Sequence, residues 1–434
     1  MSPPFLTHII FQFLTQMKTH FSPTNFFASG VAALFLSCGT GAAKTPAETK
    51  IDNALKVVEA KPGEASVYAP LAFAYASRAR ETANGDYYLK GMEAVEKALK
   101  IDPKNYDARK AEAWILLGQH EFQKALEMTR ALNKRSGDDP MVYAMRTDAA
   151  IETGNYKEAE EAAQWSLDMD AGGVPGLTRA AYLREHFGDF DGAIDLMKKS
   201  FNRVRSSDTE ERAWILTHIG HLYLLKGEAS AAERAHVEAL KIFPDYHYAL
   251  LNLAHTKSAQ GKKEEALELH RRHYAAAGHP ENLYELAKAM REAGKDSEAD
   301  KAFSEFEKAA LEESVHVDNA NRELTAYYID EANNPAEALR VANLEMANRQ
   351  DWRTLYAHAR ALHANKRFKE ARDSMSQALE VGVMVPEMQY HAGIIARDAG
   401  DRSAAKAYLE KARSIAVSKD LKELAEAAEN ALPE

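Results

Sequence analysis

Side chains suited to recognising a ligand gather in the middle of this 434-residue chain. Nine of the 16 histidines lie between residues 186 and 279, among tyrosine, tryptophan, arginine and asparagine residues. Such side chains combine apolar area with hydrogen-bonding groups, the composition of surfaces that bind peptides. The alternative is that they are ordinary solvated or half-buried positions. The predicted partner-binding residues are Arg179, Tyr182, His186, Trp214, His218, His221, Tyr248, Asn252, His255, Lys288 and Arg291.

Metal binding is a second chemistry that these histidines could support. His218 and His221 lie one helical turn apart, and His255 follows 34 residues after His221. Imidazoles on one helical face can converge on a metal ion. Ligating histidines usually hydrogen-bond to a carboxylate, and the sequence places none with them for that role. We therefore expect no metal and no cofactor, and a small-ligand or metal-binding protein is the alternative function.

Enzyme motifs are incomplete in this chain. Ser403 and Lys406 have the Ser-x-x-Lys spacing of penicillin-recognising enzymes, but Ser403 stands where a helix N-cap is expected. His120-Glu121 lacks the second histidine of the zinc-protease motif. The sequence thus offers no catalytic residue, and we expect the protein not to be an enzyme.

The elements that position the candidate side chains recur with a fixed period. A small residue opens the second of two predicted helices ten times, at intervals of 34, 34, 34, 39, 34, 33, 39, 33 and 34 residues. Such a period is typical of arrays in which each helical hairpin packs against its neighbours. The ten small residues are Gly91, Ala125, Ala159, Ala193, Ala232, Ala266, Ala299, Ala338, Ala371 and Ala405.

One unit shows the pattern in full. Between Leu216 and Tyr223, apolar or small residues at i, i+3, i+4 and i+7 predict one buried helix face. Gly227 predicts a tight turn, and a second helical stripe runs from Ala232 until Pro244 ends it. These residues resemble the tetratricopeptide repeat, with its paired small residues, turn glycine and closing proline. The resemblance covers about residues 50 to 416.

The resemblance implies an all-α fold, an α-solenoid in which about ten helix-turn-helix repeats form a right-handed superhelix. It also implies that the first helix of each repeat lines the concave side, where the predicted binding residues then lie. The same positions of later repeats carry Tyr327, Asp330, Tyr356, Arg360, His363, Tyr390, His391 and Arg397.

Four segments follow from this pattern. They are a targeting segment (1–43), a lead-in with a lone helix (44–61), the repeat array (62–416) and a C-terminal capping helix (417–434). Extra residues relative to the period lie at about 78–86, 203–211 and 311–319. We expect them to lengthen helix ends or loops, and the alternative is that they form binding loops at the edge of the array.

The charge balance disfavours one class of partner. The chain has 55 basic and 65 acidic residues and a net charge of −10. An acidic surface repels nucleic acid phosphates, and no cluster of basic residues interleaved with aromatic ones opposes this. We expect no nucleic acid partner.

The N-terminal segment resembles a secretory signal. Lys18 precedes the apolar run 26–36, and eleven residues are too few to span a bilayer. Met17 could be the true start in place of Met1, because residues 1–16 add apolar residues without charge.

The end of this segment allows two cleavage sites. Residues 34–39 resemble the lipobox of bacterial lipoproteins, although Phe35 and Leu36 depart from its usual residues. The resemblance implies a lipid on Cys38, the only cysteine. The alternatives are ordinary cleavage after Ala43 and an uncleaved N-terminus.

These features together predict an exported scaffold, either periplasmic or anchored as a lipoprotein, that binds a protein or peptide partner. Its contact with a membrane would be only through the lipid on Cys38. A structural spacer in an envelope complex is a further alternative.

Overall fold

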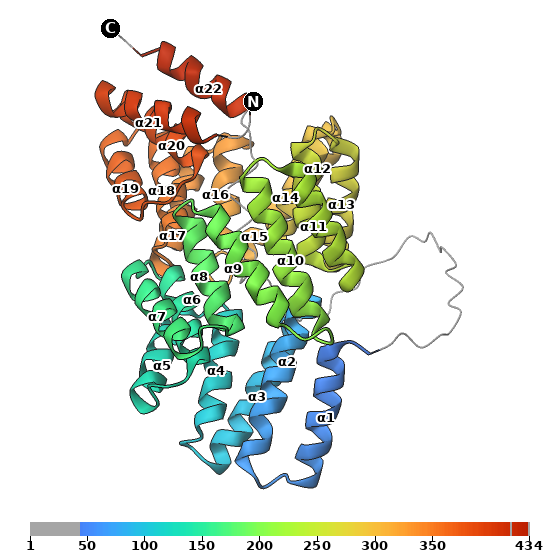
Figure 1. Ribbon diagram of the computed structural model, residues 1–434. Helices are drawn as coiled ribbons and strands as arrows, with labels where there is room; N and C mark the ends of the chain where they lie inside the picture. The colour runs from blue at the N-terminus through green and yellow to red at the C-terminus, as the bar shows by residue number, and fades with distance from the viewer. Residues whose placement is uncertain (1–43, 417–418, 433–434) are drawn as a thin grey trace, which may run out of the picture.

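The computed structural model describes residues 44–416 and 419–432, and within them it contains 22 α-helices, one short 3-10 helix (Ala65–Val67) and no strand. The prediction of an all-α solenoid is confirmed (Figure 1). In the described part, no helix has the length and apolar character needed to cross a bilayer. The targeting segment, including Cys38, lies outside the described residues.

Twenty of the helices form ten consecutive hairpins, in which each first helix packs against the second helix that follows it. The first helices are α2 (Tyr68–Thr82), α4 (Tyr106–Gly118), α6 (Pro140–Glu152), α8 (Val174–His186), α10 (Thr209–Leu225), α12 (His247–Ala259), α14 (Pro280–Glu292), α16 (Asn321–Asp330), α18 (Trp352–Ala364) and α20 (Pro386–Asp398). The second helices are α3 (Asp86–Ile101), α5 (Phe122–Arg135), α7 (Tyr156–Met169), α9 (Phe190–Arg203), α11 (Ala229–Ile242), α13 (Lys263–Ala276), α15 (Asp296–Glu313), α17 (Pro335–Asn348), α19 (Phe368–Glu380) and α21 (Arg402–Ile415). Two single helices, α1 (Pro46–Ala60) and α22 (Lys419–Asn430), flank the hairpins.

The hairpin turns need a left-handed backbone residue. Gly227 has a φ of 77°, a conformation that glycine adopts without steric cost. Where the sequence lacks this glycine, another residue takes the same conformation, with φ of 59° at His120, 47° at Asn333 and 59° at Lys366. The packing of the two helices therefore imposes the left-handed turn conformation even on residues that disfavour a positive φ.

Small residues allow the two helices of a hairpin to approach closely. A Cβ atom added to Gly220 of α10 would lie 2.3 Å from Nε2 of His236 on α11, so only glycine fits there. The alanines predicted to open the second helices are buried, including Ala232, which is fully covered. Thr147, which replaces the usual small residue in α6, is also buried and donates its hydroxyl hydrogen to the carbonyl oxygen of Tyr143 at 3.0 Å.

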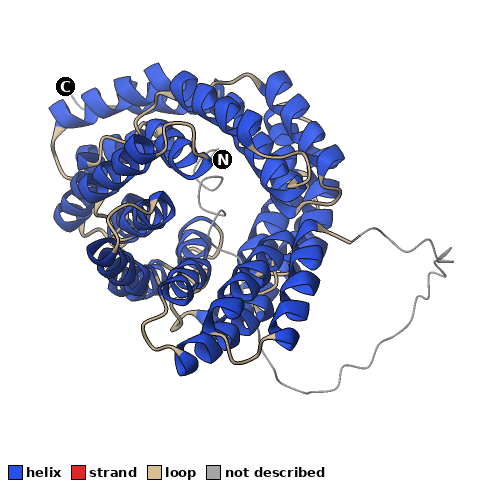
Figure 2. Cartoon of the chain, turned by 60° about the horizontal axis from the view of Figure 1, so that its bottom comes forward, coloured by secondary structure: helices blue, strands red, loops and turns tan. Residues whose placement is uncertain are grey.

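The first helices lie on the inner side of the curved array. Those of successive hairpins contact each other, for example α2 with α4 and α16 with α18. Curvature brings elements together on the concave side, and Figure 2 shows the hairpins winding around a central axis. The inner face is thus formed by the helices that carry the predicted binding residues.

One turn of the superhelix takes six hairpins, and successive turns contact each other. Hydrogen-bonded pairs 196 or 198 residues apart join a hairpin turn to the start of the first helix six hairpins later. They are His279 Nε2 with the carbonyl oxygen of Ala83 (2.9 Å), His120 Nδ1 with Asp318 Oδ1 (2.7 Å), and the backbone N–H of Trp352 with the hydroxyl of Tyr156 (2.9 Å). Figure 1 shows the green helices α6 and α8 beside the orange helices of the second turn.

The extra residues of the irregular repeats contribute to this closure. α10 has 17 residues and α15 has 18, so the added residues lengthen helices as expected. Arg80 donates to Glu210, four hairpins later, at 2.9 Å, and Asp318 pairs with His120, six hairpins earlier. The alternative, that they form binding loops at the edge of the array, stays a prediction.

Candidate functional site

Five of the predicted binding residues form one ring cluster between α8 and α10. Ring centroids lie 4.5 Å apart for Tyr182 and His186, 6.2 Å for Tyr182 and His218, 5.6 Å for Trp214 and His218, and 5.8 Å for His218 and His221. His186 and His221 are almost completely buried, with 3% and 2% of their surface exposed. The cluster therefore has a packing role, and its role in binding a partner stays a prediction.

Glu185 is the residue that sequence reasoning missed in this cluster. Its Oε2 lies 2.6 Å from Nε2 of His218, and its Oε1 lies 3.3 Å from Nε2 of His221. Burial would raise the pKa of Glu185, but the two imidazoles hold that pKa well below its usual range. Burial lowers the pKa of His221. The only sequence signal was an acidic residue on the preceding first helix, 33 residues before His218.

The third candidate metal ligand lies in a different contact. Nε2 of His255 is 3.5 Å from Oε2 of Glu285, to which Lys288 also donates at 3.1 Å. The ring of His255 lies 5.5 Å from that of His270. Within the described residues, no group of three or more histidine, cysteine, aspartate or glutamate side chains is arranged to hold a metal ion.

The remaining predicted residues are held by neighbouring side chains. Asn252 donates to the carbonyl oxygen of Tyr248 at 2.9 Å, and both side chains are buried. Arg179 Nε donates to Asp148 Oδ1 at 3.0 Å. Arg291 donates to Asp300 and lies near Glu331 and Asp296. Carboxylates of the same chain thus balance much of the charge of Arg179 and Arg291.

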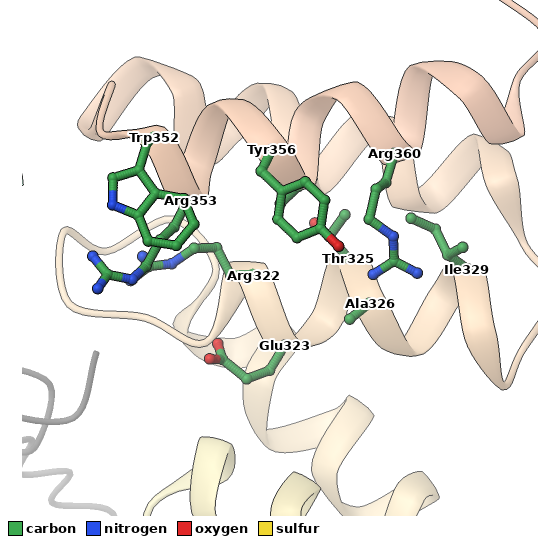
Figure 3. Close-up of a pocket in the computed structure, with 10 residues that line it drawn as sticks. Arg322, Glu323, Thr325, Ala326, Ile329, Trp352, Arg353, Tyr356 and Arg360 are labelled. Atoms are coloured by element: carbon green, nitrogen blue, oxygen red, sulfur yellow. The ribbon is translucent and has the colours of Figure 1, made fainter. Parts of the chain in front are cut away.

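An open pocket with a volume of about 70 Å³ lies between α16 and α18, the first helices of the eighth and ninth hairpins. Figure 3 shows that Tyr356 and Arg360 of α18 face Thr325, Ala326 and Ile329 of α16. The lining residues are Arg322, Glu323, Thr325, Ala326, Ile329, Trp352, Arg353, Tyr356, Ala357 and Arg360.

Internal contacts fix the wall of this pocket. Arg360 donates to Asp330 at 2.7 Å, and its guanidinium lies 5.9 Å from the ring centre of Tyr356. The Tyr356 hydroxyl is 2.7 Å from Nδ1 of His391 on α20. Burial opposes the charge on Arg360, but Asp330 beside it keeps the pKa of Arg360 above its ordinary value. Arg360 therefore stays charged at the pocket.

The far end of the pocket belongs to the closure of the superhelix. Trp352 is 1% exposed, and its ring lies 6.3 Å from that of His186 on the preceding superhelical turn. The guanidinium of Arg353 lies 4.4 Å from the ring centre of Trp352. Burial and the nearby carboxylate of Asp351 raise the pKa of Glu152 to about 7. The preceding superhelical turn therefore packs behind Trp352, whereas the residues that line the pocket all belong to α16 and α18.

Comparison with known proteins agrees with the repeat pattern. Residues 88–149, from α3 to α6, match the tetratricopeptide repeat family. The other hairpins share the buried small residues of these matched repeats.

Individual similar proteins are distant. The Bos taurus protein SGT1 homolog is 27% identical over 124 residues, which is 28% of this chain and 36% of that relative. Human IFIT1, in a structure with PPP-AAAA, has a TM-score of 0.49 and 13% identity over 85% of this chain and 87% of its own. Yeast Tom70 has a TM-score of 0.43 and 15% identity over 88% of this chain and 91% of its own. The chain is thus only distantly similar to each of the three.

Proposed function

We propose that this protein is a non-enzymatic scaffold that binds a protein or peptide partner on the inner face of its superhelix. The pocket between α16 and α18 carries the proposal, because it joins aromatic and arginine side chains on helices that line that face. Aromatic residues and arginine dominate the binding energy of protein interfaces. The ring cluster between α8 and α10 lies on the same row of first helices and extends the proposed surface.

Filling the pocket is expected to abolish partner binding. In Ala357→Phe, the added ring occupies the space that a partner side chain would enter. Affinity capture from cells that produce the protein, followed by quantitative mass spectrometry, measures the effect. Ala336→Phe is the matched control, since Ala336 lies exposed on α17.

The expected result is a partner recovered by the original protein and by Ala336→Phe but reduced at least about tenfold with Ala357→Phe. The purified partner should then bind directly with the same preference. Thermal melts establish that both variants fold. Recovery of the same proteins in equal amounts by all three forms would contradict the proposal.

We also propose that the scaffold acts in the cell envelope, held there by a lipid on Cys38. The support comes from the sequence of the N-terminal segment alone. Several acyl chains anchor a protein far more durably than one, so a lipoprotein N-terminus would suffice as an anchor.

The mature N-terminus should begin at a lipidated Cys38. Mass spectrometry of the protein purified from its own cells would then show an N-terminal peptide that starts at Cys38 and carries acyl mass. In Cys38→Ala, the protein should leave the membrane fraction. A peptide that starts after Ala43 would instead establish ordinary cleavage, and one that spans residues 17–37 would refute export by either route.

A further inference from the structure

The pocket between α16 and α18 is lined by more basic than acidic side chains. The protein has a net charge of −10, but three arginines and one carboxylate line this cavity. A guanidinium is permanently charged and presents its donors in a fork that matches carboxylate geometry. The charge of the lining therefore favours an anionic ligand.

The arginines stand at opposite ends of the pocket. Arg322 and Arg353 lie near Trp352 at one end, and Arg360 lies beside Ile329 at the other (Figure 3). Arg353 and Arg360 are seven residues apart on α18, which corresponds to about 10 Å along a helix. An extended peptide covers that distance in about three residues.

The middle of the pocket is apolar. Ala326 and Ile329 of α16 face the ring of Tyr356 on α18, and Ala357 also lines the pocket. An apolar side chain placed there would be removed from water while its flanking groups reach the arginines. The apolar middle of the pocket favours a peptide over a ligand that carries charges along its whole length.

The balance of charge at the inner end supports the same ligand. Arg322 lies 3.8 Å from Asp351, and burial together with the neighbouring Arg349 lowers the pKa of Arg322 to about 10. Arg322 is still charged at neutral pH, and Asp351, Glu345 and Glu323 offset part of the effect of burial and Arg349. An incoming carboxylate would lower the free energy of this cation.

We propose that this pocket binds an acidic peptide segment of the partner, in which two carboxylate side chains about three residues apart flank apolar residues. One carboxylate pairs with the arginines near Trp352, and the other pairs with Arg360. The inference rests on the proposed scaffold function and names the chemistry of its partner.

Fluorescence anisotropy with a labelled peptide tests the proposal directly. The probe has the sequence Gly-Ser-Glu-Leu-Leu-Glu-Ser-Gly, and its control replaces both glutamates by glutamine. We expect the glutamate peptide to bind at least about tenfold more tightly, with an affinity that falls as salt is raised. Equal binding of the two peptides, or binding of neither, would overturn the acidic ligand.

Substitutions at arginine residues show where the peptide binds. Arg360→Gln should weaken the glutamate peptide at least about tenfold and leave the weak binding of the glutamine peptide unchanged. Arg372→Gln is the matched control, because Arg372 is exposed on α19 and lies 3.4 Å from Asp373. Since Arg360→Gln also removes a partner of Asp330, Arg360→Lys and thermal melts separate lost binding from lost folding. Equal weakening by Arg372→Gln would place the peptide elsewhere and overturn the site.

A labelled single-stranded oligonucleotide of the same length is the third probe. Tighter binding of that oligonucleotide than of the glutamate peptide would overturn a peptide ligand in favour of nucleic acid. Partner capture that depends on an open pocket, combined with no binding of the acidic peptide, would refute this inference and leave the scaffold function standing.

Discussion

Replacing Asp351 by alanine is expected to lower the free energy of unfolding by about 3–5 kcal/mol, the usual result of removing one member of a buried ion pair. Asp351 is fully buried. It caps α18 by accepting from the backbone N–H of Arg353 at 2.9 Å, and it accepts from the Thr354 hydroxyl at 2.7 Å. It also faces Arg322 and Arg349, which lower its pKa against the effect of burial. The variant keeps these buried cations and removes one of the carboxylates that both of them face.

The loss should be largest where the two superhelical turns meet. Gly154 lies so close to the next turn that an added Cβ would be 2.8 Å from the carbonyl oxygen of Gln350. Hydrogen exchange in Asp351→Ala should therefore speed up at residues 152–156 and 350–354 more than in the first hairpins. Denaturant unfolding measures the free energy.

Asp373→Ala is the matched control for this prediction, because Asp373 is exposed on α19. We expect its free energy of unfolding to stay within about 0.5 kcal/mol of the original. A change below about 1 kcal/mol in Asp351→Ala, or faster exchange spread evenly along the array, would show that Asp351 does not hold the turns together.

The second large effect is a loss of stability when the pH falls from about 6.5 to 4. Burial lowers the pKa of His236 and His270 to about 3, and that of His186 and His247 to about 4. The unfolded chain binds protons on these residues near pH 6.5, whereas the folded protein does not. The stabilisation is therefore complete above pH 6.5 and is lost as the pH falls toward the folded pKa values.

Buried glutamates with raised pKa values have the opposite effect on the pH dependence of stability. Burial raises the pKa of Glu152, Glu292 and Glu387 to about 7, so their stabilising contribution is present below about pH 4.5 and is lost as the pH rises to 7. On acidification these groups offset part of the effect of the histidines. His273 and His391 also have pKa values lowered well below normal by burial, so the histidines dominate.

Thermal melts at steps between pH 7.5 and 4 measure this dependence. The melting temperature should fall below pH 6.5, and His236→Gln/His270→Gln should flatten the slope, since each group contributes at most about 1.4 kcal/mol per pH unit. A substitution at exposed His316 is the control and should change the slope less. A melting temperature that is constant over this range, or an unchanged slope in the double variant, would contradict the assignment to buried histidines.

The repeat period predicts most of the fold but little of the candidate site. Alanine at fixed intervals predicts hairpins because each alanine marks a close helix contact, and the structure places those residues in the core. Glu185 could not be recognised as the partner of His218 and His221, because that contact depends on how adjacent hairpins are rotated. For the same reason, Tyr356 and Arg360 were visible as inner-face positions, but the cavity between them and α16 was not.

The sequence by itself determined the local order of this protein: ten hairpins, their turns, their buried small residues and the acidic charge of the whole. These features follow from interactions between residues fewer than about 40 positions apart. Only the tertiary structure decided that the array closes after six hairpins, through contacts between residues 196 or 198 positions apart. Small rotations between successive repeats add up to that closure, and no single repeat encodes their sum. The closure also packs Trp352, at one end of the pocket, against His186 of the preceding turn.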